Sequence, residues 1–174
     1  MLKGLDIAFT VEPNKDEREA FSEGLPHNSI PEFLARHKSE TFHRELAPGE
    51  VLITADTLVF LDSQILGKPQ GPEDAARMLR DLSGRTHTVT TGVALRTRDR
   101  IHTFSDTTEV DFKPLTENEI AYYIERYRPF DKAGAYGVQE WIGYVGITAI
   151  RGSYFNVMGL PVQRLYTELC DFLY

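Results

Sequence analysis

Asp56 is the residue whose surroundings most require a chemical explanation. It is the one charged residue in Val51–Leu61, a run of β-branched and apolar residues typical of a strand covered on both faces. An isolated carboxylate is costly there unless it is paired, hydrated at a cleft or bound to a cation. We expect Asp56 at the carboxyl end of the strand, as a metal ligand or a base that orients water. A carboxylate that caps the next turn through Thr57 would give the same pattern.

Two lysines are candidates for holding an anion. Lys68 lies in a Gly-Lys-Pro loop, where Gly67 allows close approach of the backbone and an ammonium can hold a phosphate as a point charge. A hydrated loop lysine would look the same, and the upstream glycine and the Ser or Thr of a Walker loop are missing. Lys38 is a weaker candidate, because a lysine on a helix face is most often hydrated.

The segment 131–137, Asp-Lys-Ala-Gly-Ala-Tyr-Gly, combines small residues with one tyrosine. Such a loop leaves room for a ligand beside the face of Tyr136, on which a nucleobase could stack. A tightly packed turn would have the same composition. The five histidines form no HxxxH or HExxH motif and have no cysteine partners, so the sequence predicts no zinc site.

Composition limits the classes of function. The chain has 174 residues, of which 41% are hydrophobic, and we expect one domain over residues 1–174. A net charge of −7 argues against binding to polymeric nucleic acid or an anionic membrane surface. The single cysteine, Cys170, cannot form an intrachain disulfide, and no apolar run approaches the roughly 20 residues of a membrane span. These features predict a cytoplasmic protein with no membrane partner.

The periodicity of the sequence predicts the elements that would position these residues. Strands are expected over 51–61, 86–97 and 101–112 and near 146–150. Helices are expected from residue 30 toward 48, over 72–82, after the capping box Thr116-x-x-Glu119, and from about residue 161. This order predicts an α/β fold, with a mixed, partly antiparallel, twisted central sheet flanked by helices.

Five blocks of sequence together carry a family resemblance. They are, in order, ITADTLV, ILGKP, AARMLRDLSGRTHTVTTGVAL, FDKAGAYGVQ and GSYFNVMGLP. In this order and at these separations, they resemble the Maf family of nucleoside triphosphate pyrophosphatases over nearly the whole chain. The resemblance implies a fold like that of Maf and inosine-triphosphatase proteins. It also implies hydrolysis of a nucleoside triphosphate to the monophosphate and pyrophosphate by attack of water at the α-phosphorus.

The resemblance also implies roles for individual residues. It makes Asp56 the general base and a ligand of a divalent cation, Mg²⁺ or Mn²⁺, a chemistry suited to a carboxylate. Glu17 is implied as a second metal or water ligand. Lys38 and Lys68 match lysines that hold the triphosphate.

Base choice is implied to depend on Thr57 and Gln139. Their Ala-Asp-Thr and Tyr-Gly-Val-Gln contexts resemble the branch that acts on dTTP and UTP, not the branch that favours methylated guanine nucleotides. A glutamine amide presents both a donor and an acceptor to a pyrimidine edge. Asp131 and Lys132 are supporting candidates. The family's proposed role is removal of non-standard or excess nucleotides, with a link to arrest of cell division, and a homodimer is a further expectation.

One departure from the family pattern concerns the N-terminal residues. Maf proteins open with a strand and a Ser-x-Ser-Pro-Arg-Arg loop that grips the triphosphate, whereas Met1–Leu5 resembles the end of the helix that follows that loop. We therefore expect a fold without the family's first strand. Three hypotheses remain: an active pyrophosphatase of pyrimidine triphosphates, a nucleotide-binding regulatory protein with little turnover, or a structural domain whose motifs are relics.

Overall fold

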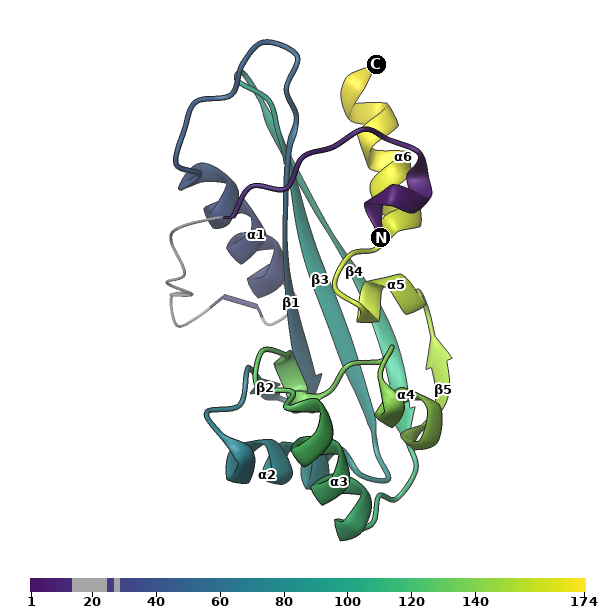
Figure 1. Ribbon diagram of the computed structural model, residues 1–174. Helices are drawn as coiled ribbons and strands as arrows, with labels where there is room; N and C mark the ends of the chain where they lie inside the picture. Colours follow the sequence, from purple (N-terminus) through teal and green to yellow (C-terminus); the bar gives the residue numbers. More distant parts are fainter. Residues whose placement is uncertain (14–24, 27–28) are drawn as a thin grey trace. The chain divides into compact units, whose positions relative to one another are not determined.

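A five-stranded sheet is the central element of the fold (Figure 1). The computed structural model describes residues 1–13, 25–26 and 29–174. The strands are β1 (Leu52–Leu61), β2 (Gln64–Leu66), β3 (Thr86–Arg96), β4 (Ile101–Phe112) and β5 (Ile147–Arg151), in the order β2-β1-β3-β4-β5. The pairs β1–β2 and β4–β5 are antiparallel, and β3 and β4 form a hairpin in which Thr97 N–H donates to the Arg100 carbonyl at 2.9 Å.

Helices flank the sheet, so the expected α/β class is confirmed. They are η1 (Leu2–Leu5), α1 (Ile30–Glu40), α2 (Pro72–Leu82), α3 (Glu117–Tyr127), η3 (Ala133–Ala135), α4 (Trp141–Gly146), α5 (Tyr154–Val157) and α6 (Val162–Leu173). The predicted capping box of Thr116 and Glu119 opens α3. In the described ranges of the chain, no helix combines the length and the apolar character that crossing a bilayer requires.

The expected antiparallel pairing is seen in the three strand pairs above. Strand β1 is covered less evenly than we expected: Leu58–Leu61 is buried, but Leu52–Ala55 is only half-buried. One expectation about the helices needs correction. Helix α1 ends at Glu40 instead of continuing toward residue 48. Its end is fixed by Thr41, whose hydroxyl and N–H both donate to the His37 carbonyl.

The described chain divides into two compact units, each of which has its own core. Unit 1 comprises residues 1–56, 91–106 and 159–174, and unit 2 comprises residues 57–90 and 107–158. Strands β1, β3 and β4 contribute residues to both units.

In unit 1, helix α6 packs its apolar face on residues of β3 and β4. Leu165, Leu169 and Phe172 are buried at helical spacing, as predicted, whereas Tyr166 and Leu173 on the same expected stripe are half-exposed. Helix η1 also contacts α6 (Figure 1). The C-terminal helix is therefore part of the core of this unit.

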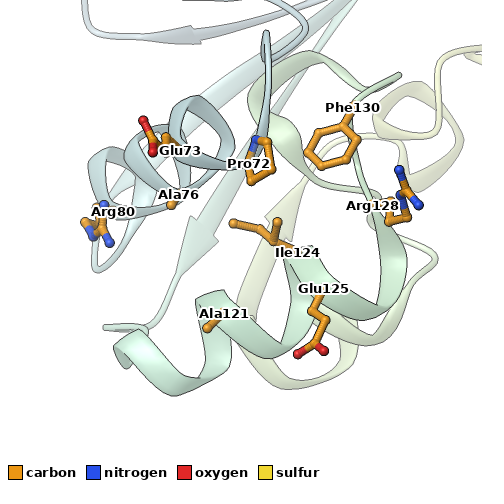
Figure 2. Close-up of a pocket in the computed structure, with 9 residues that line it drawn as sticks. All are labelled: Pro72, Glu73, Ala76, Arg80, Ala121, Ile124, Glu125, Arg128 and Phe130. Carbon is orange, nitrogen blue, oxygen red and sulfur yellow. The ribbon is translucent and has the colours of Figure 1, made fainter.

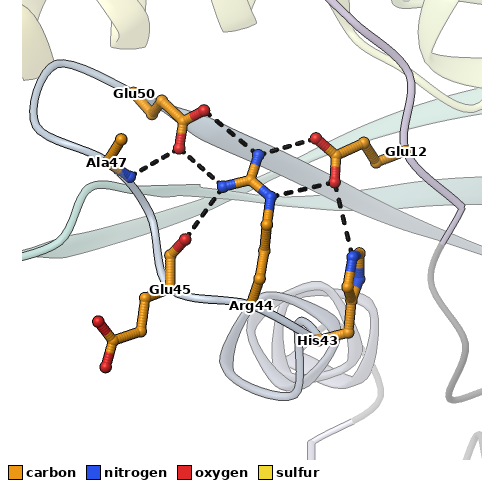
Figure 3. A network of polar contacts seen from close by, with 6 residues as sticks. All are labelled: Glu12, His43, Arg44, Glu45, Ala47 and Glu50. Carbon is orange, nitrogen blue, oxygen red and sulfur yellow. Dashed lines mark hydrogen bonds and ion pairs between the residues drawn. The ribbon is translucent and has the colours of Figure 1, made fainter.

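A cluster of charged residues in unit 1 joins the N-terminal segment to the turn that follows α1 (Figure 3). The Arg44 guanidinium donates to the Glu12 and Glu50 carboxylates at 2.8 Å each, and Ala47 N–H donates to Glu50 at 2.7 Å. The hydrogen bonds from Arg44 lower the pKa of both carboxyl groups and raise the pKa of Arg44 itself. His43 lies 3.7 Å from Glu12. This cluster fixes how the chain leaves α1.

Helix α1 lies directly on the backbone of β3 at Gly92. A Cβ atom at this position would lie 2.2 Å from both the Glu32 nitrogen and the Pro31 carbonyl carbon. No side chain fits in that space, because protein interiors are close-packed and backbone atoms cannot rotate away. Gly92 therefore sets the distance between α1 and the sheet.

We predict that Gly92→Ala destabilises unit 1 by about 3 kcal/mol, since α1 would have to move off the sheet. Urea unfolding would measure the loss. Gly71→Ala is the matched control, because Gly71 has extended backbone and an added Cβ would meet no atom within 4 Å. Equal stability of the two variants would contradict this account of the α1 contact.

In unit 2, a buried histidine and tyrosine share a hydrogen bond within the core. His87 Nε2 lies 2.7 Å from the Tyr136 hydroxyl, and the His87 ring stacks on Phe112. Burial lowers the pKa of His87 to about 4 and raises the pKa of Tyr136, so both side chains are neutral at pH 7.

This burial predicts a pH dependence of stability. Between pH 6.5 and about 4 the unfolded chain protonates His87 but the folded chain does not, so the free energy of unfolding should fall as the pH falls, by up to about 3 kcal/mol. His87→Gln keeps a hydrogen-bonding group without this titration. The difference in stability between the parent and His87→Gln, measured by urea unfolding at pH 7.5, 5.5 and 4, should therefore shift with pH. A constant difference would contradict the prediction.

Candidate functional site

Asp56 and Lys38 form a buried charge pair in unit 1. The Lys38 ammonium donates to the Asp56 carboxylate, whose side chain is 6% exposed against 27% for Lys38. Asp56 is the fifth of the ten residues of β1, so our expectation of a place at the carboxyl end of the strand was wrong. The strand continues because Leu58–Leu61 enters the core of unit 2. The carboxylate is nevertheless paired, as its burial requires.

Helix α1 is placed so that Lys38 reaches this carboxylate. The Thr54 hydroxyl, two residues before Asp56 on β1, donates to the Ala35 carbonyl at 2.6 Å. Ala35 and Ser39 are fully buried, so the face of α1 that carries them is turned inward. Lys38 lies between Ala35 and Ser39 in sequence, about one helical turn after Ala35. This spacing directs the aliphatic stem of Lys38 along the same side of α1.

In unit 2, the structure brings together two loops that lie far apart in the sequence. Gly134 N–H donates to the Gly67 carbonyl at 3.1 Å, which ties the 131–137 loop to the Gly-Lys-Pro loop. Gly134 has a φ of +69°, and a Cβ there would press on Val59 at 3.1 Å. A glycine is therefore favoured at this crossing of the two loops.

Three of the predicted charged residues meet at these loops. The Lys132 ammonium contacts the Asp131 carboxylate at 2.8 Å. This contact lowers the pKa of Asp131, with a smaller contribution from the charge of Lys68. Burial opposes the charge on Lys132, but Asp131 and Glu140 outweigh it and raise its pKa. At neutral pH the group carries ammonium and carboxylate charges close together.

Gln139 is exposed in a tight turn next to this group. Glu140, which sequence reasoning missed, follows it and contacts the Lys132 ammonium at 3.2 Å. The Tyr123 hydroxyl from α3 also donates to Glu140. One glutamate after a loop resembles an ordinary surface charge, so only its position beside Gln139 could have drawn attention to it.

Tyr136 does not offer the stacking face that we considered from its small neighbours. It is 5% exposed and packs edge-on against His87 and Phe112. The alternative of a tightly packed turn is therefore correct for this tyrosine.

Of the two expected metal ligands, Asp56 lies within the residues that the structure describes, and Glu17 lies outside them. Within the described ranges, no group of three or more His, Cys, Asp or Glu side chains is placed to hold a metal ion. Thr57 follows Asp56 and is half-buried. The predicted residues thus form two groups, Lys38 with Asp56 in unit 1, and Lys68 with Asp131, Lys132 and Gln139 in unit 2.

A pocket of about 540 Å³ lies elsewhere in unit 2, between α2 and α3 (Figure 2). It is lined by Pro72, Glu73, Ala76, Arg80, Ala121, Ile124, Glu125, Arg128 and Phe130. None of the predicted site residues is among them, so this pocket is not the candidate site.

Comparison with known proteins decides the family. The family model described as "Maf-like protein" matches residues 1–172. The chain belongs to the Maf family. This Maf chain is 52% identical over 174 residues to a protein of Porphyromonas gingivalis named dTTP/UTP pyrophosphatase, covering 99% of the chain and 87% of that protein. It is 48% identical to one of the same name from Bacteroides thetaiotaomicron (97% and 88% covered) and 44% identical to one from Flavobacterium psychrophilum (97% and 86%). The resemblance based on the five blocks is confirmed.

The charge pair leads to a prediction about stability. Lys38→Met removes the ammonium beside a buried carboxylate and should destabilise the chain by about 2 kcal/mol, less than the roughly 3–5 kcal/mol of fully buried pairs because Lys38 is 27% exposed. Adding Asp56→Asn should recover part of the loss, since the neutral amide needs no counter-charge. A double-mutant cycle by urea unfolding tests this, and strictly additive losses would contradict it.

Proposed function

We propose that this chain is a nucleoside triphosphate pyrophosphatase that hydrolyses dTTP and UTP, including modified pyrimidine nucleotides, to the monophosphate and pyrophosphate. The observation that carries the proposal is the near-complete match to relatives named dTTP/UTP pyrophosphatase, combined with a buried carboxylate held beside an ammonium. The buried carboxylate does not suit a domain with a purely structural role, because burying Asp56 costs stability that an apolar residue would avoid.

In the proposed reaction, Asp56 acts as the general base. A water oxygen bonds to the α-phosphorus, its proton passes to the Asp56 carboxylate, and the bond from the α-phosphorus to the bridging oxygen breaks to release pyrophosphate. Such phosphoryl chemistry depends chiefly on positioning and on charge stabilisation. Lys38 orients the carboxylate. By family resemblance, Lys38 and Lys68 are each proposed to supply positive charge to the phosphate oxygens.

We also propose that the reaction uses Mg²⁺ or Mn²⁺. Asp56 is the described carboxylate suited to the ion, and Glu17 is the second proposed ligand. A donor set of one or two carboxylates fits an ion that takes its other ligands from phosphates and water, as Mg²⁺ commonly does. When bound, the cation would offset the charge that develops on the phosphate oxygens.

Gln139 and Thr57 are the residues proposed to select the base. The exposed amide of Gln139 can donate to and accept from a pyrimidine edge. A base with the wrong pattern of donors and acceptors would form fewer hydrogen bonds with this amide, which would favour the pyrimidine. By family resemblance, the proposed role is removal of non-standard or excess nucleotides, with a link to arrest of cell division.

We predict that Asp56→Asn lowers the rate of pyrophosphate release from dTTP and UTP by about 10² to 10⁴-fold, as loss of a general base typically does. Asp62→Asn is the matched control, because Asp62 carries an exposed carboxylate paired with Arg85. Its rate should equal that of the parent. Equal rates for the parent and Asp56→Asn would remove Asp56 from the mechanism.

Calorimetry with dTTP and Mg²⁺ separates this function from the alternatives. Tight binding without pyrophosphate release would favour a nucleotide-binding regulatory protein. Absence of both binding and thermal stabilisation would favour a structural domain, since any ligand that binds only the folded chain must raise its stability.

A further inference from the structure

A single tyrosine hydroxyl in unit 2 holds both ends of the turn that carries Gln139. Glu140 N–H donates to the Gly137 carbonyl at 3.0 Å, which closes a four-residue turn. The Tyr123 hydroxyl accepts from Gly137 N–H at 3.0 Å and donates to the Glu140 carboxylate. The first and fourth residues of the turn are thus joined twice, once through the backbone and once through Tyr123.

The bridge is closely packed, and its central hydroxyl is buried. Tyr123 is fully buried on α3. Burial and the Glu140 carboxylate raise the pKa of Tyr123, so its hydroxyl keeps the proton that it donates. A Cβ atom at Gly137 would lie 3.0 Å from Glu140 Cδ and 3.1 Å from Lys132 Cε. The Glu140 and Lys132 side chains therefore pack closely around the turn.

Of the two central residues of the turn, one is buried and one is exposed. Val138 is 5% exposed and belongs to the core of unit 2, whereas Gln139 is exposed. The turn is closed at both ends and held down by Val138, so the backbone sets where the Gln139 side chain leaves the turn. Glu140 is also tied to Lys132, which links the turn to the charged group of the 131–137 loop.

We propose that Tyr123, acting through Glu140 and the Gly137 backbone, is a positioning residue that sets the base selectivity of Gln139. This inference rests on the proposed function, in which Gln139 reads the base. A side chain can discriminate between bases only when its amide is held in one place, because a mobile amide adapts to either hydrogen-bonding pattern. Tyr123 is buried beneath the turn and need not contact the nucleotide.

Tyr123→Phe tests the proposal, because it removes the hydroxyl and leaves the ring. We expect the ratio of kcat/KM for dTTP to that for dGTP to fall roughly 10-fold, mainly through a higher KM for dTTP. Tyr127→Phe is the matched control. Tyr127 lies on the same helix with its ring stacked on Tyr123 at 5.2 Å, and its hydroxyl makes no hydrogen bond to the described residues. The ratio should not change in this variant.

Two further variants distinguish positioning from a general loss of structure. Glu140→Ala breaks the same bridge at its other end and should lower the ratio to a similar extent, so it also serves if Tyr123→Phe does not fold. Gln139→Ala should lower the ratio by itself, and adding Tyr123→Phe to it should cause no further change, because the residue that the bridge positions is already absent.

The outcomes are distinct. A lower ratio in Tyr123→Phe and Glu140→Ala, lost in the Gln139→Ala background, supports the inference. An unchanged ratio in an active Tyr123→Phe variant, or an equal fall with Gln139 already replaced, overturns it and leaves the proposed function intact. Absence of turnover in the parent overturns the proposed function and this inference together.

Discussion

The pairing of Lys38 with Asp56 is the constraint on which the rest of unit 1 depends. A carboxylate in the middle of a strand is tolerated because an ammonium reaches it, and the ammonium reaches it because α1 lies close against the sheet. That closeness in turn requires a glycine at position 92. The buried charge, the position of α1 and the glycine beneath the helix are thus mutually dependent.

Much of the fold could be predicted from local pattern. Strands β3 and β4 are long β-branched runs, and α2 and α6 show clear helical spacing with recognisable starts. The elements that were missed, β2, α4 and α5, have only three to six residues, too few for a period to emerge. The uneven cover of β1 was also unforeseen, because an apolar run does not reveal which part of it is buried.

A site residue could be predicted from the sequence where its charge was out of place among apolar neighbours. Contacts between residues far apart in the sequence could not be predicted. Asp56 is anomalous within its own strand, so the sequence indicated it directly. The Asp56–Lys38 contact and the bridge from Tyr123 to Glu140 join residues 18 and 17 positions apart, and only the folded chain shows them. The role of Tyr136 was ambiguous for the same reason, since its partner His87 lies 49 positions away.

The burial of Tyr136 has a consequence for engineering. The 131–137 segment looks like a mutable surface loop, yet its tyrosine belongs to the core and its central glycine has a positive φ and lies close against Val59. Libraries that randomise the whole segment would therefore consist chiefly of chains that fail to fold. A search for enzymes with altered nucleotide preference is better confined to the exposed tip of the following turn, where sequence can vary without removing the support beneath it.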